Sequence, residues 1–192
     1  MNSPWTRRRW IKTALAGSAG LVLARFAGAE ELAPAEKKDA KPVERFVELF
    51  NTHTSETFRA VYKRGEEFDA IALTGLNHLL RDHRNNQSHE IDPRLFDQLH
   101  DLALAAKCDP RFEIISGYRS PESNEKMSSR PGSGVAKHSL HMQGRALDIR
   151  LKHCDCADLR DLALTAKQGG VGYYQRSDFV HIDTGTFRTW TG

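Results

Sequence analysis

Cysteine is scarce in this sequence, with three among 192 residues: Cys108, Cys154 and Cys156. The odd count excludes complete disulfide pairing within one chain. An oxidising compartment would permit a bond from Cys108 to either Cys154 or Cys156, and the sequence does not choose between them. The run from His153 to Cys156 lacks the spacing of a usual zinc knuckle. No cysteine stands near residue 29, which excludes a lipid anchor at that point.

Net charge is also low, and its sign depends on the N-terminus. The formal charge is +3, but residues 1–29 hold five basic residues and no acidic one, so the rest of the chain carries 3 − 5 = −2. Charge therefore gives no support to a nucleic-acid partner or to a membrane-surface partner.

A long uncharged apolar run is missing as well. The apolar stretch from Thr13 to Ala29 is shorter than the ~20 residues of a membrane span, and Arg25 interrupts it. A basic segment precedes it, and small residues end it, as in a cleaved signal peptide over residues 1–29. The alternative is an uncleaved membrane anchor. The order Arg-Arg-Arg-Trp-Ile-Lys resembles a twin-arginine export signal, which predicts a periplasmic protein with no stable membrane insertion after cleavage.

Residues 30–42 are charged and poor in large apolar groups, which predicts a flexible linker before a single domain over residues 43–192. Two periodicities alternate in that domain, one typical of strands and one typical of amphipathic helices. The expected strands span residues 43–50, 57–63, 112–119, 145–151, 171–174 and 179–183, and the expected helices span 68–83, 92–107 and 157–167. Because the order lacks strict βαβ alternation, it predicts an α+β fold. Residues 120–137 are rich in Ser, Pro and Gly, which predicts a long functional loop.

Three residues have the types and neighbours that a metal centre needs. His141 precedes Gly144, where the backbone can turn sharply, and an alternating strand follows with Asp148 among apolar residues. His181 lies in a later apolar strand. Two histidines and one aspartate form a three-ligand set for zinc with a fourth position open. The alternative is a pair of buried, hydrogen-bonded histidines with a buried salt bridge.

The pattern Ser-x-His-x-x-Gly-x-Ala-x-Asp with a later histidine resembles the D-Ala-D-Ala metallopeptidases, whose zinc fold is shared with lysostaphin-type endopeptidases and the hedgehog signalling domain. Four stretches are similar to the YcbK-type (MepK-like) murein endopeptidase branch: residues 76–84, 115–121, 139–144 and 169–174. The resemblance covers residues 43–190. It implies a central antiparallel sheet with flanking helices, and Zn²⁺ as the cofactor.

The resemblance also assigns roles to single residues. It implies that His141, Asp148 and His181 bind zinc, that Asp178 is the general base, and that Arg119 stabilises the oxyanion.

Residues 178 and 181 differ by an odd number, so Asp178 must lie in a turn before the strand, or a bulge must intervene. Asp183 shares a face with His181 and therefore competes as the base, or else orients a ligand. The resemblance implies that Ser139 is a small polar residue that lines the site. His138 either assists the intermediate or binds substrate, or it is an ordinary surface residue.

We therefore expect a monomeric, zinc-dependent murein endopeptidase whose partners are the stem peptides of peptidoglycan. An alternative within the same fold is a carboxypeptidase that trims terminal D-Ala from a cleft closed at one end. A non-catalytic cell-wall binding module that retains the zinc is an alternative from another class.

Overall fold

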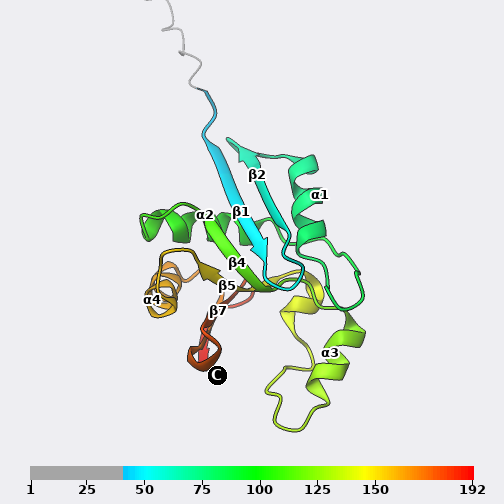
Figure 1. Ribbon diagram of the computed structural model, residues 1–192. Coiled ribbons are helices and arrows are strands. Elements are labelled where there is room, and N and C mark those ends of the chain that lie inside the picture. The colour runs from blue at the N-terminus through cyan, green and yellow to red at the C-terminus, as the bar shows by residue number, and fades with distance from the viewer. Residues whose placement is uncertain (1–40) are drawn as a thin grey trace, which may run out of the picture. The chain divides into compact units, whose positions relative to one another are not determined.

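The computed structural model describes residues 41–192, which form one mixed β-sheet with helices packed against it (Figure 1). The strands are β1 (Glu44–Asn51), β2 (Thr57–Arg64), β3 (Glu67–Phe68), β4 (Arg111–Ser116), β5 (Ala146–Leu151), β6 (Gly170–Tyr174), β7 (Phe179–Asp183) and β8 (Arg188–Thr191). The helices are α1 (Ala70–Leu79), α2 (Arg94–Ala105), α3 (Pro121–Ser128) and α4 (Cys156–Ala166), with short 3₁₀ helices η1 (Leu140–Gln143) and η2 (Gln175–Ser177). The predicted signal peptide and most of the predicted linker lie outside the described residues.

The strand order is β3-β2-β1-β4-β5-β7-β6-β8. Most neighbouring pairs are antiparallel, which confirms the α+β prediction and the mainly antiparallel sheet. Two pairs, β1 with β4 and β6 with β8, are parallel and were not expected. A parallel pair needs a crossover connection, and between β1 and β4 the connection contains the hairpin partner β2 and helices α1 and α2.

Side chains that alternate along the strands build the core on one face of the sheet. In β5, Leu147 and Ile149 are fully buried, and they pack with residues of α1, α2 and α4 in one continuous hydrophobic cluster. Full burial of such a side chain contributes about 1.5–3 kcal/mol to folding. Asp148 stands between these two residues, so strand alternation directs its side chain to the opposite face. The strands that form the core therefore also present the polar site.

Two predicted segments differ from the structure. The helix expected over residues 68–83 is shorter and ends at Leu79. It begins after Asp69, whose side chain caps it by accepting the amides of Ile71 and Ala72. The loop prediction for residues 120–137 was wrong in its first half, which forms α3. Ser120 caps α3 and Pro121 occupies its first turn, a start signal that periodicity alone misses because α3 has no continuous apolar face. Among the described residues, no helix is both long and apolar enough to cross a membrane.

Candidate metal centre

Three side chains from separate elements converge on the polar face of the sheet: His141 from η1, Asp148 from β5 and His181 from β7. Asp148 and His181 are directly paired across the β5–β7 ladder, so both side chains project to the same side. One donor atom from each of the three lies within 4.8 Å of the others, and all three residues are buried. No other group of three His, Cys, Asp or Glu donors meets this distance within residues 41–192.

Gly144 ends η1 with a left-handed backbone conformation. Its φ of 64° is left-handed, and its amide donates back to the His141 carbonyl. A Cβ at this position would stand 2.0 Å from the Glu90 carbonyl oxygen, so only glycine fits. The sharp turn expected at Gly144 is present, and it joins the His141 segment to β5.

Hydrogen bonds outside the centre determine which ring nitrogen of each histidine is free. His141 Nδ1 lies 2.8 Å from the Gly117 carbonyl, which can only accept, so Nδ1 carries the hydrogen and Nε2 keeps its lone pair. His181 Nε2 lies 3.2 Å from an Asp183 carboxylate oxygen, and its Nδ1 faces Asp148. The His141 Nε2 and His181 Nδ1 atoms are 3.3 Å apart, and Asp148 Oδ1 lies 3.3 Å from the His141 nitrogen and 2.8 Å from the His181 nitrogen. With a cation in place of a proton on His181 Nδ1, these three atoms form a donor set that fits a divalent cation such as zinc.

The electrostatics of the three groups agree with cation binding. Burial lowers the pKa of His141, which keeps that imidazole neutral. Burial opposes ionisation of Asp148, but the adjacent His141 and His181 hold its pKa well below the usual range. Burial also disfavours charge on His181, yet hydrogen bonds to Asp148 and Asp183 raise its pKa to about 9. A proton on His181 thus neutralises the centre without a metal, and a bound cation would replace that proton.

Asp183 supports His181 from outside the centre. Its carboxylate is fully buried and also accepts from Arg188 Nη2 at 2.7 Å and from the amides of Gly170 at 2.9 Å and Gly185 at 2.8 Å. These donors hold its pKa well below the usual range although burial opposes this. With its lone pairs occupied in this way, Asp183 has the contacts of a group that orients a ligand.

Arg119 lies beside the centre at the end of the segment that follows β4. Its amide donates to the His141 carbonyl, and its guanidinium donates to Asn124 Oδ1 at 3.3 Å and Ser116 Oγ at 3.4 Å. Burial lowers its pKa, and the negative charge of Asp148 opposes that shift. The Arg119 Nε–H is buried without an acceptor among the described residues, so it is available to donate to a bound group.

Asp178 occupies the turn between η2 and β7 with φ 50°, which satisfies the requirement that it precede the strand. Its side chain is 71% exposed and lies 3.7 Å from Arg150 Nε, whereas no contact joins it to the three convergent residues. The Asp178 backbone thus lies in the turn before β7, as the sequence predicted. Its carboxylate, however, pairs with Arg150 and does not contact His141, Asp148 or His181. Its role as the base remains a prediction.

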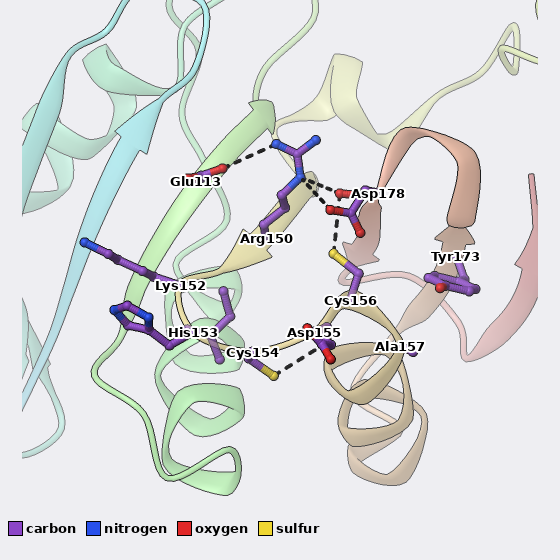
Figure 2. Close-up of a pocket in the computed structure, with 11 residues that line it drawn as sticks. Glu113, Arg150, Lys152, His153, Cys154, Asp155, Cys156, Ala157, Tyr173 and Asp178 are labelled. Atoms are coloured by element: carbon purple, nitrogen blue, oxygen red, sulfur yellow. Dashed lines mark hydrogen bonds and ion pairs between the residues drawn. The ribbon is translucent and has the colours of Figure 1, made fainter.

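The Asp178 side chain lines a pocket between the end of β5 and the start of α4 (Figure 2). Arg150 crosses this pocket, donating to the Asp178 and Ser177 carbonyls and pairing with Glu113 at 3.3 Å. The Cys156 thiol donates to the Asp178 carbonyl at 3.4 Å. These polar groups satisfy one another, and Arg150 holds the turn that leads into β7.

The two remaining predicted residues flank η1. Ser139 caps η1 by accepting the His141 amide at 3.4 Å. Ser139 therefore contacts the backbone of His141. His138 is exposed and precedes the cap.

Sequence reasoning missed an aromatic wall beside the centre. The Trp190 ring centroid lies 5.1 Å from that of His181, and its indole nitrogen donates to the Tyr174 hydroxyl at 3.0 Å. Tyr174 in turn stacks on Phe179 with centroids 4.5 Å apart. The signal that could have found this wall is the Gly-Gly-Val-Gly-Tyr-Tyr stretch, whose side-chain-free Gly172 leaves room for the Trp190 ring.

The chain is similar to members of one peptidase family over most of its length. The family described as peptidoglycan L,D-endopeptidase MepK matches residues 39–190. Peptidoglycan L,D-endopeptidase MepK of Escherichia coli strain K12 is 41% identical over 157 residues, which cover 82% of this chain and 86% of the relative. A probable peptidoglycan L,D-endopeptidase MepK of Haemophilus influenzae is 36% identical over 152 residues, covering 79% of this chain and 81% of the relative. No solved structure gives a significant match.

Proposed function

The chain belongs to the family of the peptidoglycan L,D-endopeptidase MepK, and from this premise we propose that it hydrolyses peptide cross-links of peptidoglycan with a zinc ion held by His141, Asp148 and His181. The observation that carries the proposal is the convergence of two imidazole nitrogens and one carboxylate oxygen in a buried site. The names of the relatives favour the L,D type of cross-link.

We assign a separate role in amide hydrolysis to each residue around the centre. Zinc, when bound, polarises the scissile carbonyl and lowers the pKa of water toward about 7. The buried N–H groups of Arg119 would donate to the carbonyl oxygen as negative charge develops there. Asp183 would keep His181 in the tautomer that presents Nδ1.

Asp178 is our proposed base, which takes a proton from the attacking water and returns it to the leaving amine. Two features support this assignment: the family-type position three residues before His181, and a carboxylate that is exposed and able to exchange protons. The role requires the carboxylate to leave its ion pair with Arg150 and turn toward the centre.

We also propose export through the twin-arginine pathway, removal of residues 1–29, and action as a monomer in the periplasm. The basic and apolar segments at the N-terminus support export, and the substrate of the named relatives lies in the cell wall. Sequencing of the mature N-terminus from a periplasmic fraction would test the cleavage site.

The decisive experiment is digestion of purified sacculi by the zinc-loaded protein, with products identified by mass spectrometry. Separation of cross-linked dimers into monomers is expected and would support an endopeptidase. Release of single terminal D-Ala residues without separation of dimers would indicate the carboxypeptidase alternative. Binding to sacculi without any new product would indicate the non-catalytic module.

A further inference from the structure

Strand β8 places Trp190 beside the metal centre, because Trp190, Gly172 and His181 lie in register across three neighbouring strands. Gly172 in β6 pairs with His181 of β7 on one side and with Trp190 of β8 on the other. A Cβ at Gly172 would lie 2.5 Å from the Trp190 ring, so the indole occupies the space above the glycine. This placement lets the Trp190 ring reach the His181 ring, with centroids 5.1 Å apart and planes inclined at 55°.

Tyr174 follows Gly172 by two residues, so strand alternation places it on the same face as the centre. Its ring stacks on Phe179, with a centroid distance of 4.5 Å and an interplanar angle of 16°, which fixes the direction of the hydroxyl. Trp190 Nε1 donates to that hydroxyl oxygen at 3.0 Å. Because the indole supplies a donor, the hydroxyl's own proton remains free to donate elsewhere.

Tyr174 and Arg119 are each one contact away from a residue of the metal centre. The Trp190 ring that contacts His181 also donates to the Tyr174 hydroxyl, and the Arg119 amide donates to the His141 carbonyl at 3.2 Å. Both residues therefore lie beside the metal centre. No other described residue accepts the Tyr174 O–H proton, just as none accepts the Arg119 Nε–H.

We propose that the Tyr174 hydroxyl is a second hydrogen-bond donor, beside Arg119, to the scissile carbonyl oxygen of the peptide, and that Trp190 is a positioning residue for Tyr174. This inference rests on the proposed endopeptidase function and names a further residue of the same site. A preorganised donor acts mainly on the transition state, because negative charge grows on that oxygen during attack. Loss of the donor should therefore lower kcat more than it raises KM.

The test compares Tyr174→Phe with Tyr173→Phe in the full-length, zinc-loaded protein, using purified cross-linked muropeptide dimers as substrate. Tyr173 is a matched control, since it precedes Tyr174 in β6 and its ring packs under the Arg160 guanidinium at 4.7 Å. We expect Tyr174→Phe to lower kcat by about 10²-fold, toward the lower end of the loss known for an oxyanion donor, with zinc content and Tm unchanged. Tyr173→Phe should keep kcat within about twofold of wild type, as expected for a substitution outside the site.

A Tyr174→Phe variant that retains zinc and the wild-type kcat would overturn this inference and leave the proposed function intact. A wild-type protein that cleaves no dimer would overturn both. A rise in KM with unchanged kcat would also overturn it, because that result indicates a residue that binds substrate and transition state equally.

A double-mutant cycle tests the positioning role of Trp190. Trp190→Phe keeps a ring over Gly172 but removes the N–H that directs the Tyr174 hydroxyl. We expect a kcat loss smaller than that of Tyr174→Phe and no further loss when both substitutions are combined, because Trp190 acts through Tyr174. Fully additive losses would contradict this role.

Discussion

The metal centre and the pocket that Arg150 crosses, here called the Arg150 pocket, both adjoin β5 and both contain histidine and aspartate side chains. The pocket draws its histidine and two cysteines from one contiguous run, His153 to Cys156, whereas the centre draws donors from positions 40 residues apart. Yet only the centre brings three donor atoms together among the described residues. Convergence here depends on strand register, which pairs Asp148 with His181, and not on closeness along the chain.

The two regions also differ in how their polar groups are satisfied. In the centre, Gly117 and Asp183 bind the outer ring nitrogens of His141 and His181, so the inner nitrogens face each other and Asp148. In the pocket, Arg150 donates to the Ser177 and Asp178 carbonyls and pairs with the Glu113 and Asp178 carboxylates, so these groups bind one another (Figure 2). The first arrangement favours a cation, and the second favours a stable turn.

Removal of both histidine donors should affect zinc binding and cleavage more than any other substitution. We expect His141→Ala combined with His181→Ala to reduce zinc from about one ion per chain to a trace and to abolish cleavage, because a catalytic site needs about three protein ligands. Metal analysis of the purified protein measures this. His153→Ala is the control from the pocket, and loss of zinc in that variant would break the distinction between the two regions.

Asp178 tests whether a residue of the pocket serves the centre. If it is the base, Asp178→Asn should lower kcat by about 10²–10⁴-fold while zinc content stays the same. Initial rates on muropeptide dimers would measure the loss. Activity near the wild-type level would remove Asp178 from the mechanism and leave it as part of the turn that Arg150 holds.

Replacement of Asp183 should weaken metal binding less than removal of the histidine donors does. Replacement by Asn removes the negative charge that holds His181, and such partners of ligands typically change metal affinity by about 10–100-fold. Competition with a chelator measures the affinity. Asp161→Asn is a control because Asp161 is an exposed helix residue that pairs with Arg160, and equal weakening in both variants would exclude a specific role.

A smaller effect is expected for the reactivity of the Cys156 thiol in the pocket. Burial and the adjacent Asp178 carboxylate raise the pKa of Cys156 to about 12, so almost none of this thiol is thiolate near neutral pH. After full reduction, alkylation at neutral pH should label the half-buried Cys108 and Cys154 before Cys156. Peptide mass spectrometry gives the order, and early labelling of Cys156 would show that the pocket opens readily.

The sequence allowed the α+β class and most core strands to be predicted, because apolar alternation such as that of Leu147 and Ile149 directly reflects burial. It did not predict β8, since Arg188-Thr-Trp-Thr191 has no such alternation and forms through a parallel pairing with β6. The aromatic wall was missed for the same reason. Helix α3 was missed because it buries polar Ser123 and Asn124 in place of an apolar stripe.

For the site, residue types and the family resemblance together identified the three convergent side chains and the sharp turn at Gly144. The direction of the Asp178 carboxylate could not be predicted, because it depends on Arg150, whose partners come from β4 and from the turn before β7. Local spacing fixes where a backbone turns, but it does not fix which neighbour attracts a charged side chain in the folded chain.

The position of Trp190 also has a spectroscopic consequence. The chain has three tryptophans, and the other two, Trp5 and Trp10, fall within the segment proposed to be removed on export. Intrinsic fluorescence of the processed protein would then arise from one indole packed against a candidate zinc ligand. Its emission should respond to metal loading, so occupancy of the centre could be followed by titration in solution without any cell-wall substrate.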